Sequence, residues 1–228
     1  VNLMLFVMDE FHERNIASDL LLAILSRLQA GPRPDLKLVV MSATLNAELV
    51  EAYLPGAVRI RSEGRSYPVE IHHLAHRSER PLEREVRAAV VKALNLDSGD
   101  ILVFLPGMGE IRRCMELCRD VCDGANAVAL PLHSALPMKE QQRAIEPAST
   151  RKVVFSTNVA ETSVTLDGVT TVIDSGLARV ASTELSGLVS SLQVAPISQA
   201  SATQRAGRAG RTQSGTCYRL FTLPDFRQ

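Results

Sequence analysis

The sequence predicts an α/β protein in which parallel sheets are flanked by helices. Short apolar runs alternate along the chain with longer stretches whose apolar residues recur at helical spacing, as expected of β-α-β units. Turn residues separate these segments, as Gly31-Pro32-Arg33-Pro34 does ahead of the second run. The composition is that of an ordinary globular protein, with 46% hydrophobic residues, 22% charged residues and a formal net charge of zero.

The apolar runs are expected to form strands because they are short and end at turn residues. They cover residues 3–8, 37–41, 57–61, 69–73, 101–105, 127–132, 152–156, 169–173 and 216–221. The longer segments carry an apolar stripe with helical periodicity, so we expect helices there. They cover residues 16–29, 83–94, 108–122 and 137–145.

The polar stretch Arg61–Pro68 is the best candidate for a domain boundary. Ahead of it lie two runs typical of buried strands and a short third run, and after it comes a full set of alternating elements. We therefore expect part of one α/β domain, with a linker, in residues 1–68 and a nearly complete second domain in residues 69–228. Because Val1 falls inside an apparent strand, the chain is expected to be an internal piece of a longer protein.

The cysteines favour a reducing, cytoplasmic setting. Cys114, Cys118 and Cys122 repeat every four residues on a predicted helix, a spacing that could also hold a metal. They share one helical stripe with Ile111 and Met115, so we expect them to pack in the core, where a thiol behaves as a small hydrophobe. The chain has few cysteines, no visible secretory signal and no apolar run long enough to span a bilayer.

Polar residues at the ends of predicted strands are the first candidates for chemistry. The first apolar run ends in Asp9-Glu10. This pattern is typical of a buried parallel strand that places acids at the ligand-binding edge of a sheet. One acid can hold Mg²⁺ while the other takes a proton from an attacking water, although an exposed acidic turn is the commoner alternative. The hydroxyls of Ser42-Ala43-Thr44 could bond a neighbouring loop, and those of Ser156–Ser163 could bind phosphate; both segments could also simply cap helices.

The octamer Gln204–Arg211 carries the strongest signal in the chain. Arg205, Arg208 and Arg211 recur every three residues, which places them along one side of a helical segment. The small residues between them let the backbone approach a neighbour closely. A planar, permanently charged guanidinium suits a phosphoryl group in transfer, so we favour phosphate binding over a solvated basic face.

Taken in order, four segments resemble motifs II, III, V and VI of superfamily 2 helicases of the DEAH-box branch: Asp9-Glu10-Phe11-His12, Ser42-Ala43-Thr44, Ser156–Ser163 and Gln204–Arg211. Three segments are similar to the bacterial HrpB type in particular: Arg61–Ile71, Ile101–Ile111 and Gln199–Arg211. The resemblance covers essentially the whole chain. It implies two RecA-like domains, the first truncated and the second nearly complete, that hydrolyse ATP with Mg²⁺ at an interdomain cleft and thereby translocate on RNA or DNA and unwind it.

Carried over position by position, the resemblance implies that Asp9 holds Mg²⁺ and that Glu10 orients and deprotonates the attacking water. His12 and Gln204 would face each other across the cleft and couple the nucleotide state to closure. The upstream part of the first domain would be required to complete this site.

The resemblance also assigns residues of the second domain to ATP. Arg208 and Arg211 would be the arginine fingers on the γ-phosphate. Asp174 and Gly176 would finish a strand near the nucleotide. Leu177 stands where many relatives carry an aromatic residue that stacks on adenine, so the choice of base could be loose.

The remaining assignments concern nucleic acid. Thr157 and Ser134 would contact its backbone, while Ser42 and Thr44 would link the cleft to the nucleic-acid side. Relatives place a strand-separating β-hairpin within residues 178–195, which we expect here in preference to a plain surface loop.

One departure from the family bears directly on activity. The chain contains no G-x-x-x-x-G-K-[ST] loop to cradle phosphates, so this piece alone is expected to be inactive. A non-catalytic nucleic-acid-binding module, or a translocase that moves on duplex without unwinding it, remain alternative functions.

Overall fold

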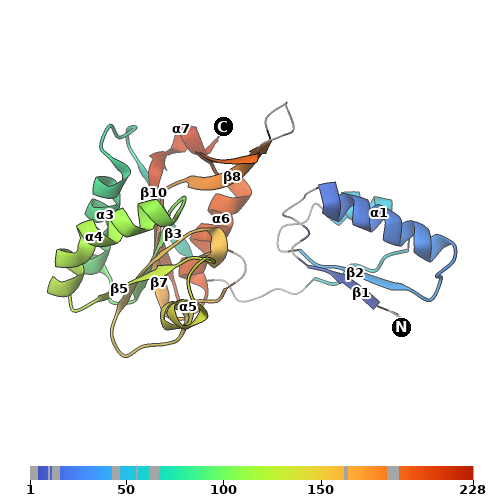
Figure 1. Cartoon of the computed structure of the whole chain (residues 1–228), viewed down its shortest axis with the longest axis horizontal. Helices are drawn as coiled ribbons and strands as arrows, with labels where there is room; N and C mark the ends of the chain where they lie inside the picture. Colours follow the sequence, from blue (N-terminus) through green and yellow to red (C-terminus); the bar gives the residue numbers. More distant parts are fainter. Residues whose placement is uncertain are drawn as a thin grey trace. The chain divides into compact units, whose positions relative to one another are not determined.

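The computed structural model describes residues 5–9, 11, 16–42, 47–54, 56–61, 67–161, 164–183 and 190–227. The chain divides into two compact units, Val1–Glu63 and Gly64–Gln228, and each contains a parallel sheet with helices (Figure 1). The predicted α/β class is therefore confirmed. In the part of the chain that the structure describes, no helix is both long enough and apolar enough to cross a membrane.

The first unit is a β-α-β element followed by a short helix. Its elements are β1 (Leu5–Met8), α1 (Ile16–Ala30), β2 (Lys37–Val40) and α2 (Ala47–Tyr53). The two strands are parallel, with Leu5 opposite Lys37 and Met8 opposite Val40. The buried core of this unit is formed by Met8, Phe11, Leu22, Leu25 and Leu36.

The expectation of a third strand at residues 57–61 is wrong. This segment has no regular secondary structure, and Val58 and Ile60 are 85% and 90% exposed. A strand needs a neighbour to receive its backbone hydrogen bonds, and the described sheet of this unit contains only β1 and β2. The expected burial of those two strands is also incomplete, because Leu5 and Val7 are 50% and 46% exposed.

The second unit is built on a six-stranded sheet in the order β3-β10-β7-β4-β6-β5, with every neighbouring pair parallel. The strands are β3 (Val69–Leu74), β4 (Asp100–Phe104), β5 (Val128–Leu132), β6 (Lys152–Ser156), β7 (Val169–Asp174) and β10 (Gly215–Thr222). Phe104 lies opposite both Asp174 and Ser156, so the strands end nearly level with one another. Their carboxyl ends therefore form one continuous edge.

Helices cover both faces of this sheet (Figure 1). The helices and helical turns are α3 (Leu82–Leu96), α4 (Met108–Gly124), α5 (Met138–Ile145), η2 (Asn158–Ala160), α6 (Gln199–Gly207), η3 (Arg208–Gly210) and α7 (Leu223–Phe226). Ile101 and Val103 pack in the cluster under α3 and α4, while Leu102 and Phe104 pack in the cluster under α5 and α6. Burial on both faces explains why the strands are continuous apolar runs.

The cysteine stripe of α4 faces the core, as the sequence predicts. Cys114, Cys118 and Cys122 are buried with Ile111 in the cluster between α4 and the sheet. Burial raises the pKa of Cys114 and Cys118 to about 12 and that of Cys122 to about 11. These thiols therefore act as apolar packing groups.

A β-hairpin connects the sheet to α6, which confirms the expected hairpin. Its strands are β8 (Leu177–Thr183) and β9 (Ser190–Pro196). They are antiparallel, with Leu177 opposite Pro196 and Thr183 opposite Ser190. Residues 184–189, between the two strands, lie outside the described residues. Figure 1 shows the hairpin extending away from the six-stranded sheet.

Candidate nucleotide and nucleic-acid site

The parallel strands of the second unit bring four predicted site residues to one edge of the sheet. Ser134 and Thr157 follow the neighbouring strands β5 and β6, Asp174 ends β7 and Gly176 follows it. Ser134 is exposed, whereas only 6% of Thr157 is exposed. The carboxyl edge of a parallel sheet is where α/β folds bind ligands, so these residues occupy a suitable place.

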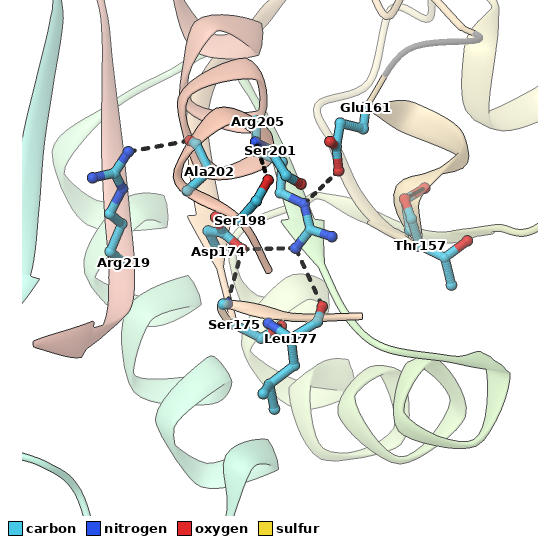
Figure 2. Close-up of polar contacts among 12 residues, drawn as sticks. Thr157, Glu161, Asp174, Ser175, Leu177, Ser198, Ser201, Ala202, Arg205 and Arg219 are labelled. Atoms are coloured by element: carbon cyan, nitrogen blue, oxygen red, sulfur yellow. Dashed lines mark hydrogen bonds and ion pairs between the residues drawn. The ribbon is translucent and has the colours of Figure 1, made fainter. Parts of the chain in front are cut away.

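Arg205 lies at the centre of a buried ion-pair cluster beside this edge (Figure 2). Its side chain is 0% exposed; Nε donates to Glu161 Oε2 at 2.9 Å and Nη1 to Asp174 Oδ1 at 2.9 Å. The guanidinium also lies 4.8 Å from the centre of the Phe104 ring. Arg205 therefore has a structural role in place of the phosphate contact that the spacing of the octamer favours.

Asp174 is fully buried and shapes the turn at the root of the hairpin. Its Oδ1 accepts hydrogen bonds from Arg205 and from the backbone N–H of Gly176 at 2.9 Å. Burial raises the pKa of the Asp174 carboxyl, and the charge of Arg205 opposes this rise. Gly176 has a φ of 72°, and a Cβ atom there would lie 2.5 Å from the Phe221 ring, so the turn requires glycine. Direct contact of Asp174 or Gly176 with a nucleotide remains a prediction.

Arg208 and Arg211 lie against the loop that follows η2. Arg208 is the first residue of η3, and its Nη1 donates to the Val164 carbonyl at 2.8 Å. Arg211 follows the same turn, and its Nη1 donates to Thr165 Oγ1 at 2.7 Å. The two arginines thus bind adjacent residues, with Arg208 6% exposed and Arg211 on the surface.

The small residues of the octamer bring α6 and η3 against the protein's own backbone. Ala206 and Ala209 are buried in the cluster on this face of the sheet. A Cβ atom at Gly210 would lie 2.5 Å from the Tyr67 carbonyl oxygen, whose residue donates its N–H to the Gly210 carbonyl at 2.9 Å. Close packing of this segment on its neighbours, rather than room for a ligand, accounts for these three residues.

Gln204 is half-buried on α6, next to Arg205. Ser198 is the N-cap residue just before the helix, and its side chain accepts a hydrogen bond from the Ser201 N–H at 3.1 Å. This N-cap fixes the start of the helix, and the register of α6 then places Gln204 and Arg205 on adjacent parts of its surface.

In the first unit, Asp9 and Ser42 follow the parallel strands β1 and β2 and so belong to the same edge of that sheet. Asp9 is exposed and Ser42 is half-buried. The Phe11 N–H donates to the Met41 carbonyl at 3.0 Å and ties the two strand ends together. The other predicted residues of this unit lie outside the described residues: Glu10, His12 and Thr44.

Glu161 and the pair Val164–Thr165 are site residues that sequence reasoning did not single out. Glu161 lies within the polar segment Ser156–Ser163, in which only the hydroxyl groups were predicted to bind a ligand. A buried arginine requires a carboxylate partner, but spacing alone does not indicate which acid supplies it. Thr165 lies just beyond the polar segment and carries no signal of its own.

Comparisons with known proteins agree with this architecture. The family described as the helicase conserved C-terminal domain matches residues 85–213. The ATP-dependent RNA helicase HrpB of Escherichia coli is 43% identical over 95% of the chain, and the pre-mRNA-splicing factor ATP-dependent RNA helicase prp22 of Schizosaccharomyces pombe is 43% identical over 97%. A crystal structure of the E. coli DExH-box NTPase HrpB covers 99% of the chain with a TM-score of 0.90 and 41% identity.

The fold and its matches thus define a RecA-like α/β protein of the helicase class. The chain belongs to the helicase conserved C-terminal domain family, and its resemblance to the HrpB type of DEAH-box helicase is confirmed. It spans 27% of the E. coli relative, 19% of the S. pombe relative and 28% of the solved HrpB chain.

Proposed function

We propose that the chain is part of an ATP-dependent RNA or DNA helicase, in which it supplies the arginines that stabilise phosphoryl transfer and surfaces that hold nucleic acid. The observation that carries this proposal is the meeting of two polar segments that are far apart in sequence. Arg208 and Arg211 from the octamer contact Val164 and Thr165, directly after Ser156–Ser163. These segments resemble motifs VI and V of the family.

The two arginines fit a role at the γ-phosphate. Guanidinium groups stabilise the charge that develops on the transferred phosphoryl group. Arg208 is held by a backbone carbonyl and is largely buried, so its position is fixed, while Arg211 is exposed and has length to reach a ligand. We propose that Gln204, with His12, relays the nucleotide state between the two units.

The first unit fits a role in activating water. Mg²⁺ is usually held by one or two carboxylates while keeping several waters, and Asp9 offers an exposed carboxylate at the end of a strand. The bound ion would neutralise charge between the phosphates. Glu10 would then take the proton of the attacking water. The phosphate-binding loop would come from upstream in a longer protein.

Nucleic acid would lie along the carboxyl edge of the second sheet. Ser134 and Thr157 follow neighbouring strands there and carry hydroxyls suited to phosphate oxygens. Ser42 and Thr44 would connect this contact with the nucleotide. Binding through the backbone should be tolerant of sequence and sensitive to salt.

The first prediction concerns Arg211. In the longer protein that carries this chain together with a phosphate-binding loop, Arg211→Ala should lower ATP hydrolysis by about 10³-fold or more, because an arginine finger is worth that much. RNA affinity without nucleotide should stay unchanged. Steady-state hydrolysis with and without RNA, and RNA binding by fluorescence anisotropy, measure the two effects.

Arg119→Ala is the matched control, because Arg119 is an exposed arginine of α4 that pairs with Glu116 on the same helix. It should leave both measurements unchanged. A variant at Arg211 that loses RNA affinity but keeps hydrolysis would contradict the finger. Absence of hydrolysis in the unmodified longer protein would instead support the non-catalytic binding module.

A further inference from the structure

The hairpin of β8 and β9 is fastened to the second unit at its root. Arg205 Nη1 donates to the Leu177 carbonyl at 3.3 Å (Figure 2). The Ile197 N–H donates to the Gly176 carbonyl at 2.9 Å. Both bonds lie where the hairpin begins and ends. If the hairpin had only these root contacts, it could pivot about the root, because a two-stranded ribbon is only marginally stable without further packing.

A second fastening point lies two residues farther along β8. Arg179 is on the same face of the strand as Leu177, and its Nη2 lies 3.6 Å from Glu110 Oε2 in the first turn of α4. The side chain of Glu110 is 15% exposed and that of Arg179 is 44% exposed. Glu110 Oε2 is buried and has no hydrogen-bond partner among the described residues, so the charge of Arg179 is what faces it.

Glu110 is itself held in place from the other side. Arg113 Nη2 donates to Glu110 Oε1 at 3.0 Å, and Arg113 Nε donates to Glu83 Oε1 at 2.6 Å. Charges of alternating sign therefore run from Glu83 on α3, through α4, to Arg179 on the hairpin. A partly buried network of this kind is more rigid than an isolated surface pair.

The residue before α4 leaves space for the arginine. Gly107 has a φ of −172°, an extended conformation that any residue adopts, so the backbone does not require glycine there. A Cβ atom at this position would lie 2.7 Å from Arg179 Nε and 3.1 Å from Glu110 Oε2. Because Gly107 has no side chain, there is room for the Arg179–Glu110 ion pair beside it.

We propose that the Arg179–Glu110 ion pair fixes the direction of the hairpin, so that Arg179 and Glu110 are positioning residues for strand separation. The proposal rests on the proposed helicase function. The family resemblance implies that the hairpin separates the two nucleic-acid strands. To do so, it must keep its direction against the duplex. The root contacts at Leu177 and the ion pair at Arg179 together define that direction, whereas the root contacts alone define a pivot.

The test is a double-mutant cycle in the longer protein, with Glu110→Gln, Arg179→Gln and the double variant. Each single change should slow the unwinding of a tailed RNA or DNA duplex by at least about threefold, and the double variant should be no slower than the slower single, since coupled residues are not additive. Nucleic-acid-stimulated ATP hydrolysis should stay within about twofold, because the described contacts of Arg179 and Glu110 do not involve the proposed arginine fingers Arg208 and Arg211. Arg179→Lys, which keeps the charge, should retain more unwinding than Arg179→Gln.

Two further variants sharpen the result. Gly107→Ala should displace Arg179 without removing a charge and should reproduce the loss of unwinding. Glu116→Gln with Arg119→Gln removes an exposed ion pair of α4 that does not involve the hairpin, and should have no effect.

Losses that multiply in the double variant, or hydrolysis that falls in parallel with unwinding, would overturn the proposal. So would normal unwinding by Gly107→Ala. If the unmodified longer protein neither hydrolyses ATP nor unwinds, the helicase function itself fails and this inference fails with it.

Discussion

Arg205 depends on partners that the chain brings from a distance. Glu161 and Asp174 lie 44 and 31 residues away from it in sequence, and both bind its guanidinium. Asp174 is 0% exposed in the pair, so the arginine rather than solvent compensates its charge. An arginine in this position stabilises the fold chiefly by preventing two acids from being left unpaired.

Replacing this residue gives the prediction at the residue scale. Arg205→Met, which keeps much of the side-chain volume, should lower the free energy of unfolding by about 3–5 kcal/mol, because it leaves a buried carboxylate uncompensated. Urea unfolding followed by circular dichroism measures the change. Arg179→Met removes an arginine that is 44% exposed and should cost under about 1 kcal/mol. Equal stability of the two variants would show that the buried cluster contributes no more than the partly exposed pair of Arg179 with Glu110.

The octamer shows what sequence can and cannot tell about single residues. Regular spacing predicts that Arg205, Arg208 and Arg211 share one side of a helical segment, and all three do bind the region between η2 and β8. Spacing cannot tell that one is fully buried while another is on the surface. That difference is decided by where Glu161 and Asp174 lie in the folded sheet, which is a matter of tertiary structure.

At the scale of elements, a strong apolar periodicity predicted the position of a helix correctly. The apolar stripe predicts a helix at residues 108–122, and α4 covers Met108–Gly124. By contrast, α6 had only its last part anticipated, because its buried contacts are made by alanines such as Ala202 and Ala206, which form no stripe of large apolar residues. Residues 57–61 show the opposite error, since alternation without a neighbouring strand does not produce a strand.

The cysteine stripe of α4 supplies the prediction at this scale. None of the four cysteines should react with iodoacetamide in the folded protein at pH 8, because all are buried and burial raises the pKa of Cys114, Cys118 and Cys217 to about 12. All four should react after unfolding in urea. Mass spectrometry counts the modified thiols in each state. Rapid labelling of Cys118 in the folded protein would mean that α4 does not pack as described.

At the scale of the whole chain, the two units differ in how completely their sheets are covered. The second unit has helices on both faces of six strands and two buried clusters. In its described residues the first unit has two strands and a small core, and apolar side chains of its sheet such as Leu5, Val7 and Val39 are 40–50% exposed. Sequence predicted the α/β class of both, but periodicity could not reveal how much apolar surface each would leave uncovered.

This difference predicts that the units do not fold equally well alone. Residues 64–228 by themselves should unfold in urea in one cooperative transition, because their cores are complete within that segment. Residues 1–63 alone should show no cooperative transition, since two strands with one covered face bury too little apolar surface to offset the loss of chain entropy. Circular dichroism and proton NMR dispersion of the two pieces measure this. Arg205→Met should destabilise the 64–228 piece as much as the whole chain, because the described hydrogen-bond partners of that arginine all lie within this piece. A 64–228 piece that lacks cooperative unfolding would mean that the second unit needs the first to form its core.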